Sequence, residues 1–333
     1  MSKFKLPKHF NPGAYPDRPD ERDFKYSDVV CGSVQIDWHT GYNVEKTLGH
    51  EVKREHQGRS SSCVGQAWAK YAEVLDHVET QRNKDLSAKS IYEQIFLNNG
   101  GAYLRDGAKT IVGGGVAEEC WIPSYEGECP PSEEYMRKSS ITSEMRDKMK
   151  TYQAKEYRFI PSSNPDLIAH AIQNNYGAVS GASGDNKGWQ DWHVKPPTSS
   201  NPWGHAYFYC GFGMNPEGKY FDFINSWGKD WGRNGVGRMY FDEYKMADNT
   251  FAVWTLVDKP NTGSEDGKIE TIKVKGKPEI FAKSKALNDD KLYWVGGWNS
   301  YQRCLKNDWI SPYYEVSEID KSKVVWEPFG FIN

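Results

Sequence analysis

Residues 205–228 read HAYFYCGFGMNPEGKYFDFINSWG, two aromatic-rich runs separated by a turn that contains Asn, Pro and Gly. Such runs are typical of two β-strands joined in a hairpin. His205 begins the first run and Asn225 ends the second, twenty positions later. A hairpin can place both side chains close together on one sheet, where the Asn oxygen would accept a hydrogen bond from one ring nitrogen and fix the tautomer. Trp227 could shield that contact from water, which strengthens it.

A second segment, QGRSSSCVGQAWA at residues 57–69, supplies a candidate nucleophile. Cys63 stands at the predicted start of an amphipathic helix, where unpaired N–H groups and the helix dipole favour a thiolate. Gln57 lies six residues earlier. Its side-chain amide, with the backbone N–H of Cys63, could hold a developing oxyanion. A lone buried cysteine is more often a small packing residue, so the assignment depends on the histidine and asparagine found elsewhere.

In their order and spacing these motifs resemble the papain family of cysteine peptidases. The family pattern has Gln-Gly before the nucleophilic Cys, His-Ala at a strand start, and Asn-Ser-Trp-Gly after it. This sequence has Gln57-Gly58 before Cys63, then His205, then NSWG at 225–228. The resemblance covers about residues 34–258 and implies an α+β fold of two subdomains. One half would be helical, the other an antiparallel β-barrel-like half, with a cleft between them.

The sequence also departs from the family pattern. Ser60 stands at the position of the family's disulfide cysteine, which suits an intracellular or particle-borne protein, and Val64 replaces the Trp that usually follows the nucleophile. Trp68, one turn further along the helix, could fill part of that space. Only 33 residues precede the mature-like start. The chain is therefore closest in style to bacterial and phage members without a long propeptide, and we expect no ordinary zymogen.

Residues that contact substrate are less clearly marked. The segment Asn99-Gly100-Gly101 resembles the family's Asn-Gly-Gly, whose backbone pairs with an extended peptide. The same residues could equally form a simple turn between two helices. Trp189 and Trp192 precede His205 and could line the cleft, or they could pack against the protein itself.

The chain divides into four predicted regions: an extended N-terminal arm (1–33), the peptidase-like domain (34–258), a polar linker (259–268) and a small aromatic-rich β module (269–333). In the domain, apolar periodicity predicts helices over 63–81, 87–98, 104–111, 139–152 and 165–174. It predicts strands over 177–183, 205–212, 219–225, 236–241 and 250–257.

Composition narrows the possible partners. A net charge of −3 argues against nucleic-acid binding. No apolar run is long enough for a membrane span or has the form of the usual signal peptide, so we expect a cytoplasmic or virion-associated protein. No cysteine lies at zinc-ligand spacing from histidines, so neither metal nor cofactor is expected. Cys120 and Cys129 could form a disulfide in an oxidising compartment or remain free thiols.

The function that these observations favour is a cysteine-type endopeptidase acting on protein or peptide substrates through an acyl-enzyme. One alternative is a phage-particle or surface protein that retains the fold for structure or binding. Another is a Cys-His cell-wall amidase. The presence of both Gln57 and Asn225 argues against a purely structural role, and the position of NSWG after the histidine argues against the amidase. Residues 269–333 could bind a docking partner.

Overall fold

The computed structural model describes residues 13–21, 23–30, 34–127, 130–257, 271–275, 280–283, 292–294, 314–316 and 324–328. The chain forms two compact units, one of residues 1–23 and 36–257, the other of residues 24–35 and 258–333. The predicted arm therefore contributes to both units. The predicted linker lies outside the described residues.

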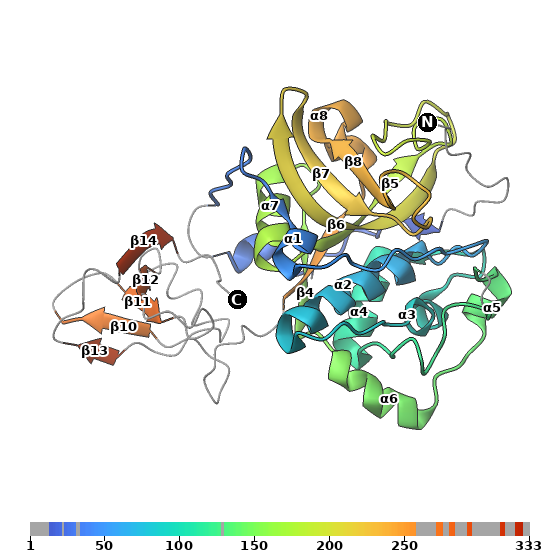
Figure 1. Cartoon of the computed structure of the whole chain (residues 1–333), viewed down its shortest axis with the longest axis horizontal. Coiled ribbons are helices and arrows are strands. Elements are labelled where there is room, and N and C mark those ends of the chain that lie inside the picture. The colour runs from blue at the N-terminus through green and yellow to red at the C-terminus, as the bar shows by residue number, and fades with distance from the viewer. Residues whose placement is uncertain are drawn as a thin grey trace. The chain divides into compact units, whose positions relative to one another are not determined.

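Helix α2 (Cys63–Thr80) runs through the centre of the first unit and is buried from Cys63 through Asp76. The sheet lies on one side of it and several shorter helices lie on the other side (Figure 1). Its polar face is therefore also buried. There Lys70 forms an ion pair with Glu73 at 2.6 Å and lies 3.5 Å from Glu55, so the buried charges offset one another.

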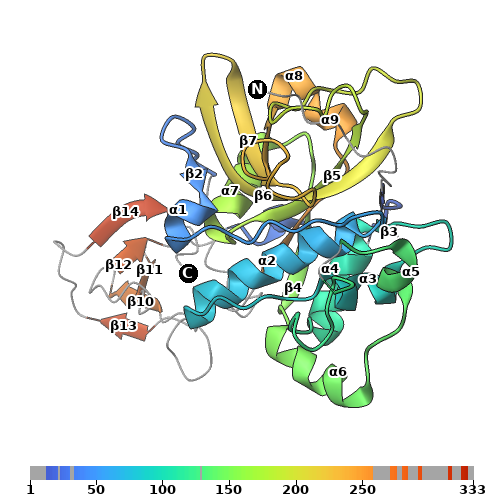
Figure 2. The same cartoon turned by 45° about the vertical axis from the view of Figure 1, so that its right-hand side comes forward.

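Shorter helices complete the helical half (Figure 2). They are α3 (Ala88–Ile95), α4 (Leu104–Gly114), α5 (Glu133–Arg137) and α6 (Ser143–Met149) with the 3-10 turn η2 (Lys150–Tyr152). Two other helices, α1 (Val44–Leu48) and α7 (Pro165–Asn174), pack against the sheet instead. Helix α7 has the predicted bounds because its ends carry local signals. Asn164 caps it by accepting from the Leu167 N–H at 3.0 Å, and Pro165 occupies the first turn, where no N–H is needed.

The second half is a curved antiparallel sheet of seven strands in the order β4-β9-β5-β6-β7-β8, with β2 paired to β6 (Figure 1). The strands are β2 (Tyr42–Asn43), β4 (Glu156–Ile160), β5 (Ala178–Gly184), β6 (Trp203–Asn215), β7 (Gly218–Ile224), β8 (Val236–Tyr240) and β9 (Val253–Val257). Two further helices, α8 (Phe241–Tyr244) and α9 (Met246–Asn249), follow β8. The α+β fold expected from the sequence is confirmed.

A two-stranded parallel pair joins the N-terminal arm to the helical half. Strand β1 (Ala14–Tyr15) pairs with β3 (Ala102–Tyr103), with Ala14 opposite Ala102. In the described residues no helix has the length and apolar character needed to cross a membrane.

The second unit contains the 3-10 turn η1 (Tyr26–Asp28) and a five-stranded sheet in the order β13-β10-β11-β12-β14. Its strands are β10 (Thr271–Val274), β11 (Ile280–Lys283), β12 (Leu292–Trp294), β13 (Tyr314–Val316) and β14 (Val324–Pro328). Ile272 and Phe281 form its buried cluster, against which Val324 packs. Most of the predicted docking region lies outside the described residues.

Candidate active site

The β6–β7 hairpin brings a histidine and an asparagine into direct contact. His205 lies near the start of β6, and Asn225 directly follows β7. The His205 Nε2 is 2.7 Å from Asn225 Oδ1, which also accepts from the Ser226 N–H at 2.8 Å. Because an amide oxygen only accepts, Nε2 carries the proton, and the neutral ring presents Nδ1 as its acceptor.

Aromatic rings enclose this pair. The Trp227 ring lies 4.6 Å from the His205 ring between centroids, and the Trp189 ring lies 5.7 Å away, edge to face. Burial lowers the pKa of His205 to about 4, against the opposing effect of its bond to Asn225. His205 is therefore neutral at pH 7, as a general base must be.

Cys63 is the first residue of α2 and is fully buried. Ser62 is the N-cap residue, but its hydroxyl lies 2.7 Å from the Ser60 hydroxyl and does not cap the helix. Instead, the backbones of Ala206, Gly13 and Val64 lie near the sulfur and act to lower its pKa. Since Ala206 adjoins His205 on β6, the fold brings the helix start to the strand that carries the histidine.

Burial raises the pKa of the Cys63 thiol to about 12, although nearby backbone groups act in the opposite direction. The expectation that the helix start would hold a thiolate is therefore wrong for this conformation. A buried anion loses its hydration, and that loss outweighs the helix N-terminus here.

Gln57 is buried beside the same residues. Its Nε2 donates to the Ser60 carbonyl at 2.9 Å, and its Oε1 accepts from the Ser226 hydroxyl at 2.6 Å. Its backbone N–H donates to the Ser226 carbonyl at 2.8 Å. The amide that the sequence suggested as an oxyanion donor is thus held by the residue that follows Asn225.

The arm crosses the site, which the sequence analysis did not foresee. The Gly13 N–H donates to the Gly204 carbonyl at 3.1 Å, and the Ala102 N–H donates to the Gly13 carbonyl at 2.8 Å. A Cβ on Gly13 would lie 1.9 Å from the Ser61 carbonyl oxygen. Only glycine fits this position. A glycine within a Pro-rich segment is therefore the single feature of the sequence that could have indicated where the arm lies.

The Asn99-Gly100-Gly101 segment is a turn that also adjoins the arm. The Gly100 N–H donates to the Leu97 carbonyl at 2.9 Å, which closes the turn. Asn99 Nδ2 donates to the Tyr15 hydroxyl at 3.1 Å, and β3 begins at the next residue, Ala102. The two interpretations of this segment, turn and peptide-pairing edge, are therefore compatible.

The two tryptophans before His205 occupy different environments. Trp189 is fully buried, and its Nε1 donates to the Tyr244 hydroxyl at 3.0 Å. It lies in the core beside His205, where no substrate can contact it, and it does not line a cleft as suggested. Trp192 is partly buried, with the Arg233 guanidinium 3.3 Å from its ring centroid.

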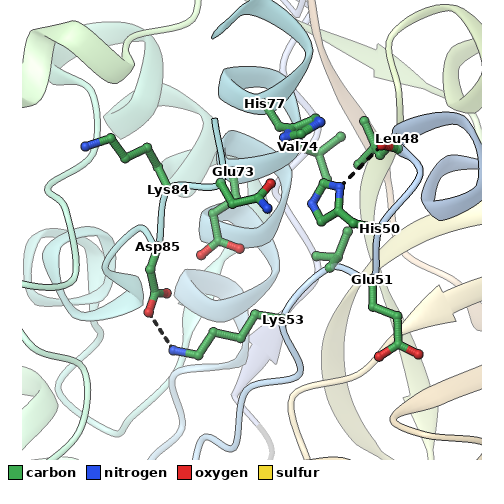
Figure 3. Close-up of a pocket in the computed structure, with 11 residues that line it drawn as sticks. Leu48, His50, Glu51, Lys53, Glu73, Val74, His77, Lys84 and Asp85 are labelled. Carbon is green, nitrogen blue, oxygen red and sulfur yellow. Dashed lines mark hydrogen bonds and ion pairs between the residues drawn. The ribbon is translucent and has the colours of Figure 1, made fainter. Parts of the chain in front are cut away.

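A hollow of about 160 Å³ lies at the other end of α2 from Cys63. Figure 3 shows His50 and His77 on one side of it, with their ring centroids 4.3 Å apart, and the Lys53–Asp85 ion pair on the other. The His50 Nδ1 points at the Leu48 carbonyl, 3.4 Å away. Within the described ranges no three His, Cys, Asp or Glu side chains gather as metal ligands.

The other described cysteines take no part in the site. Cys210 is buried on β6 and Cys120 is exposed, and both are free thiols. Cys129 lies outside the described residues, so a bridge to Cys120 stays a prediction.

A cysteine at a helix start, beside a sheet that carries a His–Asn pair, is the arrangement found in thiol peptidases. The model of the papain family of cysteine proteases matches residues 34–254, and the chain belongs to that family.

Individual relatives are distant. The chain is 23% identical to vignain from Ricinus communis over 224 residues, 65% of this chain, and spans only 57% of that relative. Among solved structures, xylellain, a cysteine protease from Xylella fastidiosa, aligns with a TM-score of 0.61 at 22% identity, covering 77% of this chain and 98% of that one. The bromelain protease from Ananas comosus, solved with the E64 inhibitor, aligns with a TM-score of 0.53 at 17% identity, covering 66% and 98%. These structures share the fold.

Proposed function

We propose that the chain is a cysteine-type endopeptidase with Cys63 as nucleophile, His205 as base and Asn225 as the residue that orients the histidine. The observation that carries this proposal is the 2.7 Å contact between His205 Nε2 and Asn225 Oδ1, beside the strand β6 against which the start of α2 with Cys63 packs. Membership of a family of cysteine proteases supports it.

The reaction proceeds in two stages. His205 Nδ1 takes the proton from the Cys63 sulfur as the sulfur attacks the peptide carbonyl carbon. The Gln57 amide and the Cys63 N–H hold the oxyanion. His205 then protonates the leaving amine as the C–N bond breaks, which leaves a thioester on Cys63. Water attacks that thioester while His205 takes its proton, and the acid product leaves as the thiol re-forms.

An extended substrate would bind where the arm now lies. Strand β1 already pairs with β3 as an added strand, so this edge accepts an extended backbone. The Gly13 carbonyl accepts from Ala102 and its N–H reaches Gly204, so the arm spans the helical half and the sheet. In this state Cys63 and His205 are both fully buried. The arm must therefore move before a substrate reaches the sulfur.

The decisive experiment compares wild type with Cys63→Ala on denatured protein, a peptide library and an epoxide or vinyl-sulfone thiol probe. Wild type should cleave and take the label, and the variant should do neither. Cys120→Ser, which removes an exposed free thiol away from His205, is the matched control and should cleave normally. Undiminished cleavage by Cys63→Ala would refute the mechanism. Cell-wall stem peptides tested in parallel identify an amidase if they alone are cut.

A further inference from the structure

A small cavity in the first unit has Asn225 among the residues that line it. Its volume, about 10 Å³ for the centre of a water-sized sphere, is close to what one water molecule requires. Residues of the loop before α2, of α2 itself, of β6 and of the end of β7 line it. Among them are Gln66, one turn after the nucleophile, and Asn225.

Three amide atoms of residues that line this cavity have no hydrogen-bond partner among the described residues. They are Gln66 Nε2, Gln66 Oε1 and Asn225 Nδ2. Both residues are only 2% exposed. Buried amides without partners are rare because they lose their hydration and gain nothing in exchange. A cavity of this size, lined by residues that carry several such atoms, is where ordered water is found in proteins.

We propose that one water molecule occupies this cavity, accepts from Asn225 Nδ2, and donates to Gln66 Oε1. Through this water Gln66 acts as a positioning residue for Asn225 and so for His205. The water site stands on its own, whereas the role in catalysis rests on the proposed function.

The physical reason is that the two ends of the Asn225 amide are not equivalent. Asn225 Oδ1 accepts from His205 Nε2 at 2.7 Å, which keeps Nδ1 as the basic nitrogen. If the amide turned over, its NH₂ would face Nε2 and favour the opposite tautomer. The Ser226 N–H bond to Oδ1, at 2.8 Å, opposes that rotation from one end. The water opposes it from the other end, because it gives Nδ2 an acceptor.

The test uses Gln66→Met, which keeps the length of the side chain and removes both amide atoms. We expect kcat to fall about tenfold, within the usual range for coupled neighbours, with KM unchanged. The unfolding temperature should change little, because one water-mediated hydrogen bond contributes little net stability and Met fills the same space. The control is Gln94→Met on α3, where the amide donates to the Ser90 carbonyl of its own helix at 2.6 Å, and kcat should be unchanged.

A double-mutant cycle with Asn225→Ala separates positioning from general damage. If Gln66 acts through Asn225, Gln66→Met causes no further loss of kcat in the Asn225→Ala background. Multiplying losses would overturn the positioning role.

A high-resolution crystal structure of the wild-type chain tests the water independently of activity. Density within hydrogen-bonding distance of both Asn225 Nδ2 and Gln66 Oε1 supports the site, and a dry cavity overturns it. If the water is present and Cys63→Ala cleaves as well as wild type, the proposed function fails while the water site stands.

Discussion

The two sides of the His205–Asn225 pair are built differently. On one side lies the arm, whose strand β1 is only two residues long and is held to β3 and Gly204 by backbone hydrogen bonds. On the other side lies the aromatic core around Trp189, which meets the rings of Trp227 and Tyr244. A two-residue strand can leave without disturbing the core, whereas the core cannot open without unfolding. The site is therefore accessible from one side only.

The arm is nevertheless fixed at a defined point. Asp17 accepts from Trp254 Nε1 at 2.8 Å and from the Arg105 N–H at 3.0 Å. Arg105 also pairs with Asp23. These contacts lie beyond β1 in the chain, so residues 13–15 can separate from β3 while Asp17 stays in place.

The largest expected effect concerns the aromatic core around Trp189. Trp189→Ala should lower the free energy of unfolding by about 3–5 kcal/mol, the usual cost of removing a large buried aromatic side chain. Trp192→Ala, at a partly buried site under Arg233, should cost less than about 1 kcal/mol. Urea unfolding measures both. Equal losses would show that the two tryptophans do not differ as the structure indicates.

An intermediate effect follows from the neutral histidine. The pKa of His205 is about 4 in the folded chain against an ordinary 6.5, so the unfolded chain binds the proton more readily. Protonation of His205 therefore costs no stability above pH 6.5. As pH falls from 6.5 toward 4, it lowers the free energy of unfolding by up to about 3 kcal/mol. Glu73 and Glu119, with pKa values raised to about 7 by burial, act in the opposite direction over this range. The effect of His205 is therefore measured as the difference in free energy of unfolding between wild type and a His205 variant, in which the effects of the two glutamates cancel.

His205→Gln should gain up to about 3 kcal/mol in stability relative to wild type between pH 6.5 and 4. His170→Gln on α7 is the positive control. It should show the same pH-dependent gain, since burial also lowers the pKa of His170 to about 4. Urea unfolding at several pH values gives both curves. A pH-independent difference for His205→Gln would mean that its ring is not held neutral.

The smallest expected effect concerns the arm. Gly13→Ala places a Cβ against the Ser61 carbonyl and should displace the arm, so that a thiol reagent labels Cys63 about tenfold faster at pH 7.5. The controls are Gly113→Ala and Gly114→Ala, glycines of α4 whose added Cβ meets nothing within 4 Å. These should label at the wild-type rate. Unchanged labelling of Gly13→Ala would show that the arm does not shield the sulfur.

The Gly13→Ala variant also tests whether the arm keeps His205 buried. With the arm displaced, His205 becomes more exposed, so its pKa should rise toward 6.5, whereas that of His170 should not change. The pH-dependent difference for His205→Gln should then shrink in the Gly13→Ala background.

Local patterns in the sequence predicted much of the fold. The bounds of α7 were predicted correctly because its cap and proline are adjacent in sequence. The β6 and β7 strands were predicted from aromatic runs and turn residues, although β6 extends from Trp203 to Asn215. Strand β4 (Glu156–Ile160) was missed. Its five residues mix charged and apolar side chains, and it forms only by pairing with β9, nearly a hundred residues later.

The sequence by itself determined the family, and it predicted which cysteine, histidine, asparagine and glutamine make up the candidate site, because these are properties of residue type and spacing along the chain. Tertiary structure alone decided that the polar face of α2 is buried, that Trp189 lies in the core, and that the arm covers Cys63. It also decided the protonation states, since a pKa depends on how much water a group has lost, and this is set by segments distant in sequence. Spacing along a chain carries no information about that loss of water.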